Sequence, residues 1–125
     1  MAMNRQDVYR ANSVYTAPAN VQIAQLHRQA AIWTKGIRAD VSEGKTADAR
    51  QKIQYIQDIV TFLRANLDFS FEVSRKAEST YIYHYKILVD WFLYPQHVVD
   101  NEDEYQAMVA FWESWAQTWA SVPSK

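Results

Sequence analysis

The sequence predicts an all-α protein, an antiparallel up-down four-helix bundle preceded by a short N-terminal arm. Three observations lead to this fold class. Apolar residues recur at steps of three and four along four long segments, the spacing of one helix face. Only two glycines and three prolines occur, mostly at the edges of these segments. The connections are short, so successive helices should be antiparallel neighbours.

The composition of the chain argues against several classes of protein. The 125 residues suit one domain, and the absence of cysteine excludes disulfides and thiolate catalysis. A net charge of −1 argues against a nucleic-acid partner. The densest apolar run, 81–94, carries charged residues and is too short to insert into a membrane. The first residues contain no apolar stretch typical of a secretory signal.

The arm is expected over residues 1–17, and the bundle over 18–125. Pro18 suits the first position of helix one, and Gly44 is a plausible C-cap, because glycine enters the left-handed conformation freely. The predicted seam of helix one comprises Ile23, Leu26, Ala30, Trp33, Ile37 and Val41.

Helix two is expected to follow a Thr46 cap. Its predicted core seam comprises Ala49, Ile53, Ile56, Val60, Leu63 and Leu67. A second apolar stripe lies on the flank of this seam and comprises Tyr55, Ile59 and Phe62. Together the two stripes cover about half of the helix surface.

Helix three is expected between a Ser70 cap and Tyr94, because Pro95 cannot continue a helix. Its predicted core face comprises Ala77, Tyr81, His84, Leu88 and Trp91. Between Tyr81 and Tyr94, all residues but His84, Lys86 and Asp90 are apolar or aromatic. A single stripe facing the bundle core cannot bury all of these apolar and aromatic residues.

Helix four should begin at an Asn101 cap, with Glu104 three residues on and an acidic first turn that suits the helix dipole. Pro123 ends it. Its predicted seam comprises Tyr105, Met108, Trp112, Trp115, Trp119 and Val122.

The surplus of apolar surface on helices two and three is the main functional indication, because large exposed apolar patches usually mark interaction sites. The arm, a second copy of the chain or a client protein could cover it. Alternatively, helix three is simply the most buried element of the bundle.

The sequence shows no pattern typical of a catalytic, metal-binding or cofactor-binding site. His27, His84 and His97 fall on different segments, without the paired carboxylates and histidines of a di-iron bundle. Neither a phosphate-binding loop nor a Ser-His-Asp arrangement can be assigned. We therefore expect no enzymatic activity, no metal and no cofactor. His84 is expected to be a hydrogen-bonded histidine at the edge of the core.

Four collinear motifs resemble the FliS family of flagellar secretion chaperones. They are Tyr9-x-x-Asn12-Ser13-Val14-x-Thr16-Ala17-Pro18, Phe62-Leu63-x-x-Asn66-Leu67-Asp68, Tyr81-x-Tyr83 with Leu88, and Phe111-Trp112-x-x-Trp115-x-x-x-Trp119. Their order and spacing agree from Tyr9 to Trp119. The chain departs from the family pattern in having Ala17 before the proline, a histidine at 84, and tryptophans at 112 and 115.

The resemblance implies a cytoplasmic chaperone that binds the C-terminal segment of flagellin, prevents its premature polymerisation and aids its delivery to the flagellar export apparatus. The client is expected to become partly helical in apolar grooves of the bundle. The expected groove residues are Ile56, Ile59, Phe62, Leu63, Tyr81, Tyr85 and Leu88. In the arm, Tyr9, Asn12 and Val14 are expected to act as a lid or to dock at the export gate.

Two rival hypotheses remain at this stage. The surplus surface could be the interface of a homodimer, formed when the client is absent or in a structural protein without any flagellin client. The other rival is a small bundle enzyme that binds a metal or a ligand.

Overall fold

The computed structural model describes residues 19–70 and 72–121 as an all-α bundle. Four long helices make up the bundle: α2 (Ala19–Ser42), α3 (Thr46–Ala65), α4 (Glu72–Leu93) and α6 (Glu102–Ala120). A short helix that the sequence did not predict, α5 (His97–Asp100), connects α4 to α6. The arm expected over residues 1–17 lies outside the described residues.

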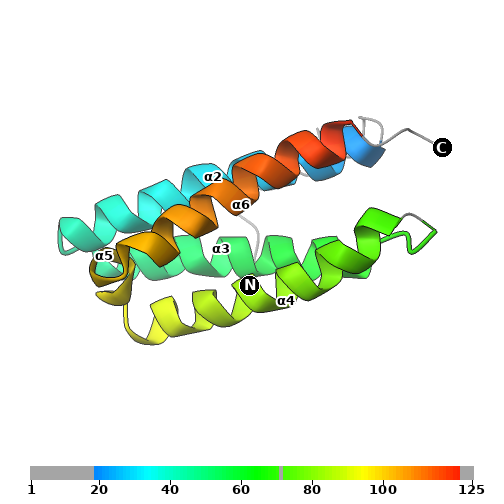
Figure 1. The fold of residues 1–125 in the computed structure, drawn as a ribbon. Helices are drawn as coiled ribbons and strands as arrows, with labels where there is room; N and C mark the ends of the chain where they lie inside the picture. Colours follow the sequence, from blue (N-terminus) through cyan, green and yellow to red (C-terminus); the bar gives the residue numbers. More distant parts are fainter. Residues whose placement is uncertain (1–18, 71, 122–125) are drawn as a thin grey trace.

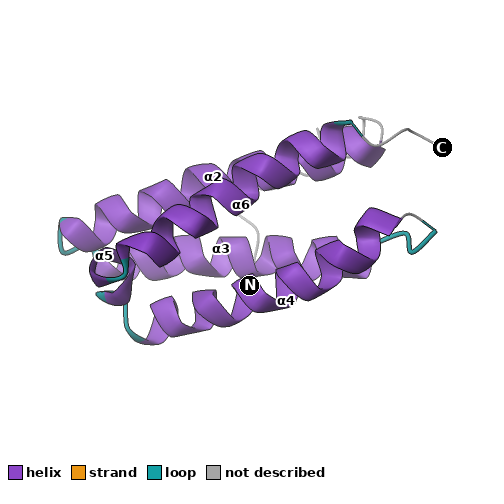
Figure 2. Ribbon diagram, in the orientation of Figure 1, coloured by secondary structure: helices purple, strands orange, loops and turns teal. Residues whose placement is uncertain are grey.

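The helices run up and down in chain order, so each long helix is antiparallel to the next (Figure 1). Helix α2 packs closely on both α3 and α6, whereas α4 packs on α3 and lies across from α2 (Figure 1). Loops occupy only the ends of the bundle, and no strand occurs in the described part of the chain (Figure 2). The predicted fold class is therefore confirmed.

The core seams of α3 and α4 are confirmed by the burial of their side chains. Ala49, Ile53, Ile56, Val60 and Leu63 of α3 are buried, as are Ala77, Tyr81, His84, Leu88 and Trp91 of α4. Leu67 packs against this core from the end of α3 and is partly exposed.

The seam predicted for α2 is partly wrong. Ala30 and Ile37 are buried, but the other four predicted residues, Ile23, Leu26, Trp33 and Val41, are only half-buried. The buried face is instead broader and turned toward α6, and it includes Ala24, His27, Ala31 and Thr34. Short alanine side chains let α2 approach α6 closely. The two polar side chains are tolerated because each bonds to a carbonyl one turn earlier, of Ile23 and Ala30 respectively.

The turn between α2 and α3 forms as the sequence predicts. Gly44 has a φ of 76°, the left-handed conformation that glycine adopts without steric cost. The Lys45 N–H donates to the Asp40 carbonyl at 2.7 Å, and the Gly44 N–H donates to that of Val41 at 3.1 Å. These two bonds are the Schellman pattern, which satisfies carbonyls at the end of α2.

The predicted helix N-caps differ from those in the structure. Helix α3 begins at Thr46 itself, so Lys45 takes the cap position and makes no side-chain cap bond. Asn101 does precede α6, but its side chain also makes no cap bond. Glu104 does not close a capping box, because its Oε1 accepts a hydrogen bond from the buried Trp91 indole at 3.1 Å. The carboxylate thus joins α6 to α4.

Large aromatic side chains fill the space between α4 and α6. His84 stacks on Phe111 with ring centroids 3.8 Å apart, and its Nδ1 donates to the Thr80 carbonyl. On α6, the Phe111 and Trp112 rings also contact each other, at 4.7 Å. Trp115, predicted for the core, is only partly buried, while Phe111, Val109 and Ala116 are buried instead. Predicted seam residue Val122 lies outside the described residues.

Candidate functional site

The client-binding residues expected from the sequence divide into buried and accessible groups. Ile56, Leu63, Tyr81 and Leu88 are at most 2% exposed and belong to the core of the bundle. They therefore present no surface to a partner in this conformation, and their expected contact with a client would require the bundle to open. Their side chains point into the core because α2 and α6 cover the α3 and α4 faces that carry them.

Phe62 and Tyr85 remain as accessible members of the expected set, with Ile59 buried beside them. Phe62 and Tyr85 are half-buried, and Ile59 is 7% exposed, so it contributes only the floor of a surface. The three arm residues of the expected set, Tyr9, Asn12 and Val14, lie outside the described residues.

An aromatic edge runs along the junction of α2 and α3. Trp33 of α2 stacks against Tyr55 of α3, with ring centroids 4.8 Å apart, and both rings are partly exposed. Phe62 follows Tyr55 on the same face of α3 two turns later, with Ile59 between them. We call Trp33, Tyr55, Ile59 and Phe62 the α2–α3 aromatic edge.

Trp33 was predicted for the core seam of helix one, so it was not expected in this edge. The tryptophan is only half-buried, and its ring contacts that of Tyr55 on α3. Of the flanking stripe predicted beside the seam, Tyr55 and Phe62 are half-buried, whereas Ile59 belongs to the buried core. Trp33, the neighbour of this stripe across the helix junction, could not be predicted, because the sequence does not show how α2 and α3 are rotated relative to each other.

A second apolar surface covers the outer face of α4. Tyr83, Val89, Leu93 and Tyr94 are 61%, 39%, 58% and 57% exposed. The predicted excess of apolar surface on this helix is therefore real, and the bundle does not bury it. None of the four belongs to the expected client-binding set, because that set was chosen from the core-facing side of the helix.

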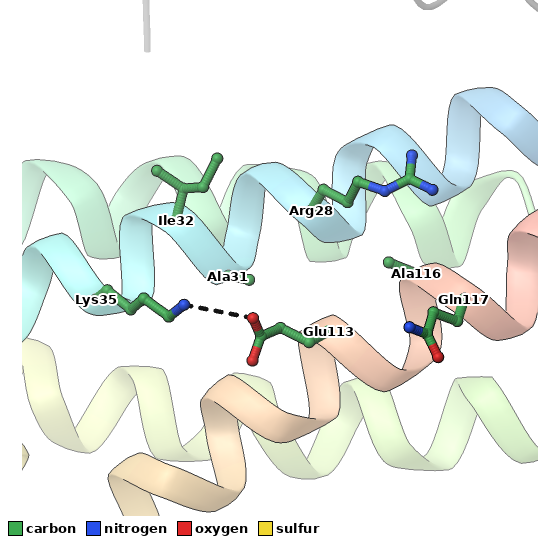
Figure 3. Close-up of a pocket in the computed structure, with 7 residues that line it drawn as sticks. All are labelled: Arg28, Ala31, Ile32, Lys35, Glu113, Ala116 and Gln117. Atoms are coloured by element: carbon green, nitrogen blue, oxygen red, sulfur yellow. Dashed lines mark hydrogen bonds and ion pairs between the residues drawn. The ribbon is translucent and has the colours of Figure 1, made fainter.

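A shallow groove lies between α2 and α6 (Figure 3). Ala31 and Ala116 form its floor, and Ile32 stands exposed at its rim. Lys35 and Glu113 form an ion pair at 3.3 Å across it, while Arg28 extends along α2 (Figure 3). Both partners of this ion pair are more than half exposed, so it contributes little to stability. The groove contains no cluster of groups that resembles catalytic machinery.

The titratable groups with altered pKa are structural. Burial lowers the pKa of His27 to about 4, although its bond to the Ile23 carbonyl acts in the opposite direction. Burial also lowers the pKa of His84 and raises that of the Tyr81 phenol. On the surface, the Arg38 guanidinium pairs with both carboxylate oxygens of Glu102 and lowers the pKa of that carboxyl. None of these groups lines the groove between α2 and α6.

Metal-binding and membrane-spanning features are not seen in the described residues. Across 19–70 and 72–121, no three histidine, aspartate or glutamate side chains are grouped to hold a metal ion. None of the described helices combines the length and apolarity needed to cross a bilayer. The accessible features described above are apolar surfaces on α2, α3 and α4.

Comparison with known families shows the class of protein to which the chain belongs. A family model described as flagellar protein FliS matches residues 1–125, the whole chain. The chain belongs to the FliS family. No curated protein and no solved structure matches it. FliS proteins are flagellar chaperones, and an up-down helical bundle with uncovered apolar surface suits a protein that holds another chain.

Proposed function

We propose that this FliS protein acts in the cytoplasm as an export chaperone for flagellin. It binds the C-terminal segment of flagellin, keeps that segment from polymerising early and aids its delivery to the flagellar export apparatus. The observation that carries this proposal is the match to the FliS family over the whole chain. Residues of the arm, Tyr9, Asn12 and Val14, are proposed to cover the client surface or to dock at the export gate.

The α2–α3 aromatic edge is the surface to which we assign the client. Its aromatic rings offer large contact areas with few rotatable bonds, so little side-chain entropy is lost on binding. Trp33 and Tyr55 are already held against each other by their ring contact, and all three rings are half-buried, which further reduces this loss. A segment that is disordered before binding must offset its own ordering entropy, and a preformed receptor surface helps it to do so.

The edge also fits a helical client in its spacing. Tyr55, Ile59 and Phe62 lie at i, i+4 and i+7 on α3 and present side chains along about 10 Å of the helix. An amphipathic helix of the client, with apolar residues at the same spacing, could lie along this line. Tyr85, a half-buried residue of α4 that packs against the core, is proposed to extend the contact if the client continues around the bundle.

The experiment that tests this proposal compares two substitutions of the same kind. Phe62→Glu places a charge in the aromatic edge, whereas Phe69→Glu places one on an exposed phenylalanine in the loop after α3. Binding of the flagellin C-terminal segment is measured by calorimetry on the full chain. We expect Phe62→Glu to weaken binding at least about tenfold and Phe69→Glu to change it less than about twofold.

Circular dichroism and thermal unfolding of both variants show whether the bundle is intact. Equal tail affinities for both folded variants and the wild type would remove the aromatic edge from the client site. No measurable binding of the tail by the wild-type protein would contradict the proposed function itself.

A further inference from the structure

The groove between α2 and α6 is bordered on the α2 side by two cations with an apolar side chain between them. Arg28, Ile32 and Lys35 lie at i, i+4 and i+7 on α2, and all three are exposed. They span about 10 Å of the helix. Ile32 is 61% exposed, the largest exposed fraction of any described isoleucine. We call these three residues the α2 ridge.

The two cations of the α2 ridge are weakly matched within the chain. Arg28 forms no ion pair with any residue of 19–70 or 72–121. Figure 3 shows an uncharged residue, Gln117, opposite it on α6. Lys35 pairs with Glu113 at 3.3 Å, but both side chains are more than half exposed, so water and salt screen the pair. The groove therefore contains one unpaired cation and one cation whose partner is easily replaced.

The floor of the groove allows another chain to approach closely. Ala31 of α2 and Ala116 of α6 are buried there, and a methyl group is the largest side chain that either presents. The groove is shallow and runs between two helices, so it can accept a few side chains of a second helix rather than enclose a small molecule.

From these features we propose that the groove docks an acidic amphipathic helix of a partner protein other than the flagellin tail. Carboxylates at i and i+7 of that helix meet Arg28 and Lys35. Apolar side chains at i+3 and i+4 cover Ile32 and the alanine floor. The contact is short, and its charges are on the rim, so we expect weak and salt-dependent binding.

The chemistry of the groove favours this occupant over three others. An extended segment would need free backbone groups to pair with, whereas helices satisfy theirs internally. A single phosphate ion would need converging cations, but Ile32 separates the two cations, and Arg28 extends away from Lys35 (Figure 3). A basic helix would be repelled by Arg28, which has no anion beside it to offset the repulsion.

The groove is separate from the surface assigned to flagellin. Ile32 lines the groove shared with α6, whereas its neighbour Trp33 contacts Tyr55 on α3. Successive residues of a helix are about 100° apart, so the two surfaces lie on different sides of α2. A helix in the groove and a tail on the α2–α3 aromatic edge can therefore be bound together. The inference holds whether or not flagellin is the client.

A designed peptide tests the proposal on the full chain. The probe is a synthetic helical peptide with glutamate at i and i+7 and leucine at i+3 and i+4, and the control peptide has glutamine in place of both glutamates. Fluorescence anisotropy at low ionic strength measures binding. We expect a Kd below about 1 mM for the acidic peptide and at least about threefold weaker binding of the glutamine peptide.

Substitutions in the groove should change the affinity in both directions. Arg28→Glu and Ile32→Glu should each weaken binding of the acidic peptide at least about fivefold. Glu113→Gln should strengthen it about two- to fivefold, because Lys35 is released and an anion is removed from the groove. Lys76→Glu, a charge reversal at an exposed position of α4, is the matched control and should change binding less than about twofold. Circular dichroism shows whether each variant is folded.

Four outcomes would overturn the proposal. They are no binding of the acidic peptide up to roughly 1 mM, equal binding of the acidic and glutamine peptides, and unchanged binding to a folded Arg28→Glu variant. The fourth is an Arg28→Glu variant that loses the flagellin tail as strongly as Phe62→Glu does, since the groove would then belong to the client. Binding of the tail by the wild-type protein is measured separately, so failure of the proposed function and failure of this inference give different results.

Discussion

The hydroxyl of Tyr81 donates a 2.6 Å hydrogen bond to Nε2 of His27, a residue 54 positions earlier in the chain. His27 Nδ1 lies 2.7 Å from the Ile23 carbonyl, which can only accept, so that nitrogen carries the proton and Nε2 is the acceptor. The Trp119 indole in turn donates to the Tyr81 oxygen at 3.0 Å. Three helices, α2, α4 and α6, are thereby joined by one fully buried chain of hydrogen bonds.

Removing the Tyr81 hydroxyl should destabilise the bundle. Tyr81→Phe leaves both His27 Nε2 and the Trp119 N–H without a partner in a buried site. Each unsatisfied group costs about 1–3 kcal/mol, so we expect a loss of about 2–4 kcal/mol in the free energy of unfolding. Urea unfolding measures this loss. The matched control is Tyr83→Phe on the exposed face of α4, where the change should stay within about 0.5 kcal/mol.

Stability should also fall in mild acid because of His27. Its pKa is about 4 in the folded chain against an ordinary value of 6.5, so between these values the unfolded chain binds a proton that the folded chain does not. The contribution of neutral His27 to the free energy of unfolding is therefore fully present above pH 6.5. It is lost as the pH falls toward 4. From pH 7 to pH 5 the loss is about 2 kcal/mol.

The control for this pH dependence is His27→Gln, whose amide can still accept a hydrogen bond but does not titrate. Urea unfolding at pH 7 and pH 5 should show a smaller difference for this variant than for wild type. A difference of the same size would place the acid sensitivity elsewhere; the second buried histidine, His84, would then be the first to examine, since burial lowers its pKa as well.

The bond between Glu104 and Trp91 predicts unequal effects for two acidic residues of one helix turn. Glu104→Ala leaves the buried Trp91 indole N–H unsatisfied and should cost about 1–3 kcal/mol. Asp103→Ala removes an exposed carboxylate from the same turn and should cost less than about 1 kcal/mol, the contribution of the helix dipole. Thermal unfolding of the two variants compares them. Similar losses would indicate that the dipole accounts for both.

The two glycines should respond differently to alanine. Gly44→Ala forces a side chain into the left-handed conformation and should destabilise the chain by about 1–2 kcal/mol. At Gly36, inside α2, the added Cβ would meet only the Cδ and Cε atoms of Lys52, the movable end of a side chain that pairs with Asp40. The gain in helix propensity is about 1 kcal/mol and offsets the disturbed ion pair.

We therefore expect Gly36→Ala to change the free energy of unfolding by less than about 1 kcal/mol in either direction. Chemical denaturation of both glycine variants under the same conditions provides the comparison. A Gly44→Ala protein as stable as wild type would mean that the turn can rearrange to another conformation.

Helix spacing accounts for most of what could be predicted about the fold. The step of three and four residues identified all four long helices, and Pro95 and Gly44 placed two of their ends. The short helix α5 was missed because four residues are too few to show a period. The predicted caps failed for a different reason: a side chain such as Glu104 has several competing partners, and a tertiary one can replace the local one.

The sequence by itself determined that four amphipathic helices form, that α3 and α4 carry more apolar surface than one core can bury, and that the chain matches the FliS family. Only the tertiary structure decided which of those apolar residues are accessible. Ile56 and Leu63 are buried while Phe62 remains half-exposed, because accessibility depends on how far each helix rotates toward two neighbours. A periodic pattern reports the spacing of residues along one helix and contains no information on that rotation.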